Sequence, residues 1–141
     1  MTVKEYLEQV ENLDRQKKSI REQLYELDTE RKSVSSVLTK AKVQTSLRPG
    51  KLADLTAAFV DLQDVYIIHI TRLLRLKYDI QSMIDTLEDS NQQLVLMERY
   101  INLKRWLDVA EDNSYSLSSV YRFHSDALKA LQKKFSDRFE V

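Results

Sequence analysis

The side chains best suited to binding chemistry lie in the last third of the chain, between residues 104 and 125. Arg122 carries a planar guanidinium that can donate two parallel hydrogen bonds to a guanine edge, and Leu117 or Tyr121 can contact a thymine methyl group. Hydroxyls and cations that suit phosphate oxygens stand nearby. The candidate DNA-binding residues are Lys104, Arg105, Ser116, Leu117, Ser118, Ser119, Tyr121, Arg122, His124 and Ser125.

Within this set two kinds of contact are expected. Base edges would be reached by the residues on the outward face of one helix, which are Leu117, Ser118, Tyr121, Arg122 and Ser125. Phosphates would be reached by Ser116, Ser119, Lys104, Arg105 and His124, together with the first amides of that helix.

Such a set works only on two short helices that cross steeply. A helix-turn-helix needs a small residue at the crossing, a tight turn four residues later and a branched apolar anchor six residues beyond the turn. Ala110, Ser114 and Val120 stand at these positions. Val109, Tyr115 and Phe123 are expected to supply apolar partners, and Ser116 is expected to cap the second helix.

The turn itself departs from the usual pattern. Its position favours glycine because the backbone adopts a positive φ there, and this chain has Ser114. Asn113 is the alternative residue to take the left-handed conformation. Upstream, a further helix is expected after Asp89, with Ser90 as its N-cap.

These residues also carry a family resemblance. The last third resembles the C-terminal signature of ArpU-like phage regulators, a family that is similar to region 4 of sigma-70-type factors. The residues in question are Arg99, Tyr100, Ile101, Asn102, Trp106, Val109, Ala110, Tyr115, Ser116, Val120, Tyr121, Arg122, His124, Ala127 and Leu128. The runs Lys4–Leu7, Leu13–Asp14 and Asp61–Leu62 resemble a related phage family. The resemblance implies an activator of phage genes, late or packaging genes among them, that works with host RNA polymerase.

The first two thirds of the chain show a heptad pattern, in which apolar positions alternate at four and three residues. A period of 3.5 keeps one narrow seam against a partner helix, as in a coiled coil. The first seam contains Tyr6, Val10, Leu13, Lys17, Ile20, Leu24, Leu27, Arg31, Val34 and Leu38. The second contains Leu52, Leu55, Phe59, Leu62, Tyr66, His69, Leu73, Leu76, Ile80, Met83 and Leu87.

Pro49 and Gly50 separate the two seams, so a turn is expected near residues 43–50 and the helices should form an antiparallel hairpin. A long hairpin of this kind favours homo-oligomers that bury the flanks of the seams. The polar seam residues Lys17, Arg31 and His69 are interpreted as setting register, although His69 could instead be a ligand or a pH switch.

Composition supports this fold class and excludes others. Pro49 and Gly50 are the only proline and glycine, too few for a turn-rich β or α/β fold, so an all-α protein is expected. We predict a hairpin over residues 1–88 and a helix-turn-helix domain over residues 89–141. The net charge is zero overall. Residues 99–141 hold eight basic and six acidic side chains, a weak bias towards phosphate.

Other function classes lack their minimal motifs. The absence of cysteine excludes disulfides, thiolate metal sites and a thiol nucleophile, and fits a cytoplasmic protein. No apolar run approaches the roughly 18 residues that span a bilayer. No metal-ligand spacing, phosphate loop or catalytic constellation is present, so we expect no enzyme, no metal and no cofactor. The alternative to a DNA-binding regulator is a helical adaptor that binds RNA polymerase or a repressor without touching DNA.

Overall fold

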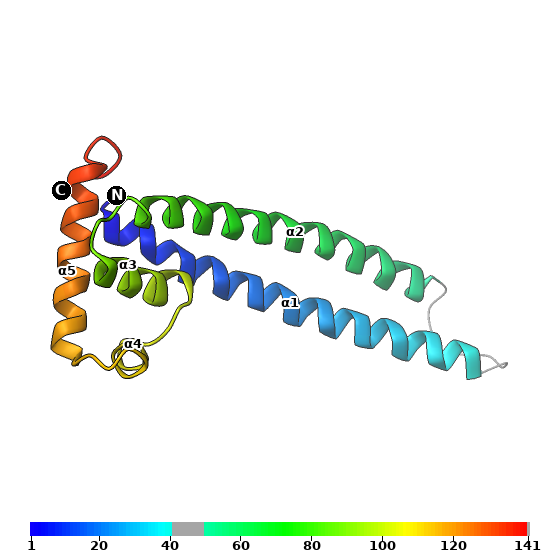
Figure 1. The fold of residues 1–141 in the computed structure, drawn as a ribbon. Coiled ribbons are helices and arrows are strands. Elements are labelled where there is room, and N and C mark those ends of the chain that lie inside the picture. Colours follow the sequence, from blue (N-terminus) through cyan, green and yellow to red (C-terminus); the bar gives the residue numbers. More distant parts are fainter. Residues whose placement is uncertain (41–49, 141) are drawn as a thin grey trace. The chain divides into compact units, whose positions relative to one another are not determined.

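The computed structural model describes residues 1–40 and 50–140, in which every regular element is helical. In chain order these are α1 (Val3–Lys40), α2 (Lys51–Ile84), α3 (Ser90–Leu96), the π-helix η1 (Met97–Ile101), α4 (Trp106–Asp112) and α5 (Leu117–Lys134) (Figure 1). The predicted all-α class with a long N-terminal helix pair is confirmed. Apart from Gly50, the predicted turn at residues 43–50 lies outside the described residues. In that described part, none of the helices has the length and apolar character that crossing a membrane requires.

The chain divides into two compact units. The arm unit comprises residues 15–72, and the terminal unit comprises residues 1–14 and 73–141. The boundary therefore differs from the expected one at residue 88. The reason is that the first turns of α1 and the last turns of α2 bury their apolar side chains in the same cluster as α5.

In the arm unit, the predicted seams form the less exposed faces of the two helices. Ile20 and Val34 are buried, and the remaining seam positions of this unit are partly buried except Leu38, which is exposed. The Arg31 guanidinium lies over the ring of Phe59, 4.3 Å from its centroid. Arg31 also pairs with Asp28 at 2.7 Å. A seam arginine is thus accommodated by a cation–π contact and a neighbouring carboxylate.

The core of the terminal unit, here called the base cluster, joins segments that are far apart in sequence. It comprises Val3, Leu7, Val10, Leu73, Ile80, Met83, Ile84, Leu87, Leu96, Tyr100, Ala127, Leu131 and Phe139. These side chains come from α1, α2, α3, η1 and α5 and from the segment after α5. Their joint burial removes the apolar ends of the long helices from water, which is the main stabilising contribution to this unit.

A polar contact fixes the same ends. The Tyr6 hydroxyl donates to Asp79, and the Arg138 guanidinium donates to Asp79 at 2.7 Å. Hydrogen bonding from Arg138 holds the pKa of Asp79 below its usual value, while burial raises the pKa of Tyr6. The start of α1 and the last turns of α2 therefore lie side by side in antiparallel order within the terminal unit. Thr2 and Glu5 form a capping box at the first turn of α1, in which the backbone amide of each donates to the side-chain oxygen of the other.

The start of α3 corrects one expectation. Asp89, not Ser90, is the N-cap, with extended backbone dihedrals of φ −85° and ψ 120°. Its carboxylate accepts hydrogen bonds from the amides of Asn91 at 2.8 Å and Gln92 at 3.1 Å. A charged acceptor at a helix N-terminus also interacts favourably with the helix dipole, an advantage the Ser90 hydroxyl lacks.

Replacing Asp89 by Ala should lower the free energy of unfolding by about 1 kcal/mol, because two amides lose their acceptor. Ser90→Ala is the matched control, and its effect should stay within about 0.5 kcal/mol. Urea denaturation followed by circular dichroism measures both. A larger loss for Ser90→Ala than for Asp89→Ala would contradict this assignment of the cap.

Candidate nucleic-acid interface

The candidate interface is built on a sharp turn between α4 and α5. Ser114 has a φ of 55°, in the left-handed region, as its position in the pattern predicts. Asn113 has a φ of −110°, so the alternative that Asn113 makes the turn is wrong. The Asn113 amide instead donates to the Val109 carbonyl at 2.8 Å and to Glu98 at 2.9 Å. The backbone amide of Tyr115 closes the turn on the Ala110 carbonyl at 3.0 Å.

A second apolar cluster, here called the crossing cluster, locks α4 against α5. It consists of Val95, Val109, Ala110 and Val120, with Trp106, Tyr115, Leu117 and Phe123 packed around it. Ala110 is small enough for the two backbones to approach, and Val120 is fully buried. In Figure 1, α4 is seen nearly end-on where it meets the first turns of α5, so the two helices cross steeply. The packing expected around Ala110, Val120, Tyr115 and Phe123 is present.

The first turn of α5 is capped as predicted. The Ser116 hydroxyl accepts a hydrogen bond from the Ser119 amide at 3.1 Å and donates to the Ser119 hydroxyl at 2.9 Å. This contact satisfies one of the amides that a helix start leaves without a helical partner. The amides of Leu117 and Ser118 precede the capped one and point out of the same helix end.

One face of α5 is exposed over its first three turns. It carries Ser118, Tyr121, Arg122 and Ser125, all exposed and spaced three, one and three residues apart. Arg122 lies over the neighbouring Phe123 ring, 5.4 Å from its centroid. Among residues 1–40 and 50–140, no carboxylate pairs with Arg122. The guanidinium therefore keeps its hydrogen-bond donors available to a ligand.

Leu117 does not belong to this face. Its side chain is partly buried and packs against the crossing cluster. The expected contact between Leu117 and a thymine methyl group is therefore not supported, because the side chain already fills the space beside Val120 and Val109. Ser119 is also partly buried, and its hydroxyl is engaged with Ser116.

His124 is turned towards the protein interior, contrary to its predicted role at phosphate. Its Nε2 and the Tyr100 hydroxyl are hydrogen-bonded at 2.7 Å, and its ring meets Trp106 edge-on at a centroid distance of 4.6 Å. Burial lowers the pKa of His124 to about 4, with Lys4 and Arg99 adding to the effect. At neutral pH the imidazole is uncharged and cannot pair with a phosphate.

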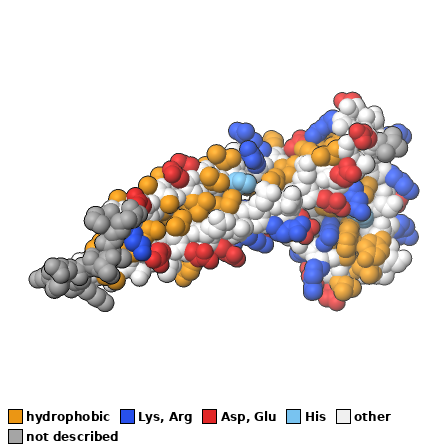
Figure 2. Space-filling view, turned by 180° about the vertical axis from the view of Figure 1, so that it is seen from behind, with side chains coloured by type: hydrophobic (Ala, Val, Ile, Leu, Met, Phe, Trp, Pro, Cys, Tyr) orange, Lys and Arg blue, Asp and Glu red, His pale blue; other side chains and the backbone are white. Residues whose placement is uncertain are grey.

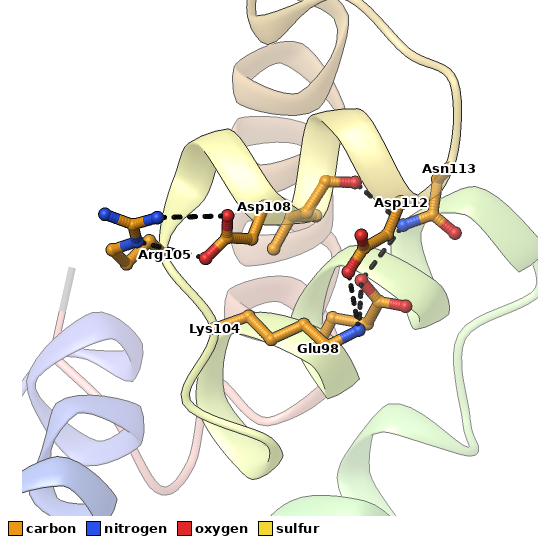
Figure 3. A network of polar contacts seen from close by, with 7 residues as sticks. Glu98, Lys104, Arg105, Asp108, Asp112 and Asn113 are labelled. Atoms are coloured by element: carbon orange, nitrogen blue, oxygen red, sulfur yellow. Dashed lines mark hydrogen bonds and ion pairs between the residues drawn. The ribbon is translucent and has the colours of Figure 1, made fainter.

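The two predicted cations before α4 are engaged by carboxylates (Figure 3). Lys104 pairs with Asp112 at 3.0 Å and with Glu98 at 3.5 Å. Arg105 pairs with Asp108 at 3.0 Å. The hydrogen bond that Lys104 donates to Asp112 raises the pKa of Lys104. These carboxylates offset part of the positive charge that the two cations would present to a phosphate.

Several residues that shape this surface were missed in the sequence. Tyr100 is buried on η1, and burial raises its pKa to about 12. Its pairing with His124 spans 24 residues and leaves no local signal. Leu107 is 56% exposed on α4, next to Trp106. The helical period of α4, which places the buried Val109 on roughly the opposite side from Leu107, is the signal that could have shown this.

The described residues offer no metal site. Within residues 1–40 and 50–140, no group of three or more histidine, aspartate or glutamate side chains is arranged to hold a metal ion.

The buried state of His124 predicts a pH dependence of stability. Its pKa of about 4 lies below the ordinary value of 6.5, so protons bind more tightly to the unfolded chain. The contribution of the neutral, buried His124 to the free energy of unfolding is therefore fully present above pH 6.5, and it is lost as the pH falls towards 4. Between pH 7 and 4.5 the free energy of unfolding should fall by on the order of 2 kcal/mol more in the wild type than in His124→Gln.

This difference is measured by urea denaturation of both proteins over that pH range. The variant keeps His69 and every carboxylate, so the comparison isolates His124. Identical pH profiles would show that His124 titrates normally and is not buried against Tyr100.

Comparison with known proteins places the chain in a family. A family model described as a protein of unknown function (DUF1492) matches residues 34–132, well over half of the chain, and the chain belongs to this family. The match includes all of α2, α3, η1 and α4 and most of α5. No curated protein and no solved structure matches the chain.

Proposed function

We propose that this member of the DUF1492 family is a sequence-specific DNA-binding transcription regulator in which α5 enters the major groove. The observation that carries the proposal is the Arg122 guanidinium, exposed on the second turn of α5 and without a carboxylate partner among the described residues. Arginine at such a position donates two parallel hydrogen bonds to the O6 and N7 atoms of guanine.

The surroundings of Arg122 suit a groove. Ser118 and Ser125 are short polar side chains one turn before and one turn after it, so neither hinders the approach of a base pair. Tyr121 is 47% exposed and can present its ring edge to a thymine methyl group. The steep crossing with α4 leaves the start of α5 protruding, with the Leu117 and Ser118 amides available to a phosphate.

Electrostatic attraction at this surface is modest. Lys104 and Arg105 are held by acidic neighbours, and α4 itself carries Asp108, Glu111 and Asp112. Affinity would therefore depend on directional contacts and on two copies binding together more than on charge. The resemblance to ArpU-like regulators extends the proposal to activation of phage genes together with host RNA polymerase.

A second candidate function is a helical adaptor that binds a protein through the same surface. Two observations favour it. Leu107 and Tyr121 expose large apolar side chains on α4 and α5. The ion pairs of Lys104 and Arg105 lower the positive charge that duplex DNA attracts. An apolar patch with internally neutralised charges suits a protein partner such as a polymerase subunit.

DNA binding is tested by fluorescence anisotropy with two labelled duplexes at several salt concentrations. One duplex comes from the DNA beside the protein's own gene, and the other has the same composition in shuffled order. Arg122→Ala should weaken binding to the first duplex by about 5- to 150-fold, equivalent to roughly 1–3 kcal/mol, and leave the second nearly unchanged. The matched control is Arg21→Ala, which removes one exposed positive charge from the arm unit.

The other outcomes are equally informative. Equal weakening on both duplexes, with a salt slope lower by about one, would make Arg122 a phosphate contact. Equal effects of Arg122→Ala and Arg21→Ala would remove α5 as the reading helix. Failure of the wild type to bind either duplex at low salt would favour the adaptor.

A further inference from the structure

Helix α2 carries a second apolar face within the arm unit. It contains Ala53, Ala57, Val60, Asp64, Ile67, Ile68 and Thr71, which recur at three- and four-residue spacing. Ile67 is 59% exposed and Val60 is 47% exposed. The seam residues Phe59, Leu62 and Tyr66 lie on roughly the opposite side of the helix. Of the two sides, the seam is the one that contacts α1, where Arg31 lies over the Phe59 ring, whereas Val60 and Ile67 on the second face are exposed. Figure 2 shows, from one side, hydrophobic side chains lying among charged ones along the surface of the long helices.

Apart from Asp64 and Thr71, the members of the second face are apolar. The Thr71 hydroxyl donates to the Ile67 carbonyl at 2.8 Å, so its polar group is already satisfied within the helix. Asp64 is the single charged residue of the face and lies near its middle. A helix that is apolar on two opposite sides needs two partners to bury both.

Charged residues of both signs lie along one edge of this face. Asp61 flanks the face towards the N-terminal end, with Asp54 seven residues earlier on the same edge, and Arg72 flanks this edge eleven residues after Asp61. Among the described residues neither Asp61 nor Arg72 takes part in an ion pair. These two residues are about 16 Å apart along the helix, too far to pair within one chain. The other edge of the face, at Thr56, Gln63 and Ile70, is uncharged.

We propose that this face binds the same face of a second copy of the chain, with the two α2 helices antiparallel and the two-fold axis beside Ile67. In an antiparallel pair, the same edge of the two helices lies on the same side of the interface. Asp61 of each copy therefore meets Arg72 of the other, which gives two symmetric ion pairs. In a parallel pair the charged edge would face the uncharged one, and no such pairing would form. Charge complementarity thus selects both the occupant and its direction.

This association follows from α2 alone and does not depend on DNA binding. It also buries three large apolar side chains of the second face, Val60, Ile67 and Ile68, which are exposed in the single chain. A partner of different sequence would need the same pattern of apolar and charged positions to bind this face. A second copy of the chain has that pattern by symmetry.

Cysteine cross-linking tests the direction directly, because the natural chain contains no cysteine. Ile67→Cys places a thiol beside the two-fold axis and should give a dimer on mild oxidation. Val60→Cys lies on the same face, but its two copies would be about 20 Å apart, beyond the reach of a disulfide. We expect a cross-linked dimer for Ile67→Cys and none for Val60→Cys. Light scattering of the wild-type protein should give the mass of a dimer.

Every other pattern overturns the proposal. Cross-linking of both variants would indicate parallel helices, and cross-linking of neither would place the partner elsewhere. A wild-type mass of a monomer at high protein concentration would exclude the association altogether. Equal labelling of both thiols with a maleimide in dilute solution confirms that the two cysteines are equally reactive.

A charge exchange tests the predicted ion pair. Asp61→Arg should raise the dimer dissociation constant by about tenfold, because both symmetric pairs become repulsive. Adding Arg72→Asp to the same chain restores opposite charges and should return the constant to within about threefold of the wild type. Arg21→Asp, a reversal on α1 outside this face, is the matched control and should have little effect.

Sedimentation equilibrium without DNA measures all four proteins. No rescue by the second substitution would overturn the antiparallel pairing of Asp61 with Arg72. Since DNA is absent, failure here is distinguishable from failure of the proposed DNA contact at Arg122.

Discussion

The burial of one stripe of α5 governs the geometry of the C-terminal half. Val120 of α5 belongs to the crossing cluster, and Ala127 and Leu131 belong to the base cluster. Between them, His124 is hydrogen-bonded to Tyr100 and packed against Trp106. Because one helix is held at three levels, its rotation about its own axis is fixed. The side chains left outside, Arg122 foremost, are consequently those that α5 can offer to a partner.

A network of polar contacts holds α4 in place. Lys104 and Asn113 both contact Glu98 of η1, and Lys104 also contacts Asp112. These contacts tie both ends of α4 to η1 and maintain its steep crossing with α5. They also neutralise the positive charge of Lys104, which would otherwise attract the phosphates of a nucleic acid. Binding of DNA by such a surface would depend on a few well-placed hydrogen-bond donors. Two linked copies binding together would compensate for the weak electrostatic attraction between each copy and DNA.

Helix α2 shows how one helix can serve two purposes. Its seam residues, such as Phe59, face α1, whereas Val60 and Ile67 remain exposed on the other side. Its last turns contribute Ile80, Met83 and Ile84 to the base cluster. Association of two copies through the outer face would bring two terminal units into one particle. A regulator that recognises paired half-sites requires that arrangement.

The sequence by itself determined the helical class, the two seams, the turn at Ser114, the cap at Ser116 and the packing of Ala110 with Val120. These features follow from local periodicity and turn chemistry, which a run of neighbouring residues contains in full. Only the tertiary structure decided that Leu117 and His124 face inward, that Lys104 and Arg105 are paired with carboxylates, and that Asp89 caps α3. It also decided that the ends of the long helices join the terminal unit. For Leu117, His124 and the ends of the long helices, the physical reason is that their placement depends on the rotation of α5 and on contacts between residues distant in sequence, which no local pattern specifies. The Asp89 cap and the Arg105–Asp108 pair join residues two or three apart, and there the sequence left the choice between neighbouring partners open.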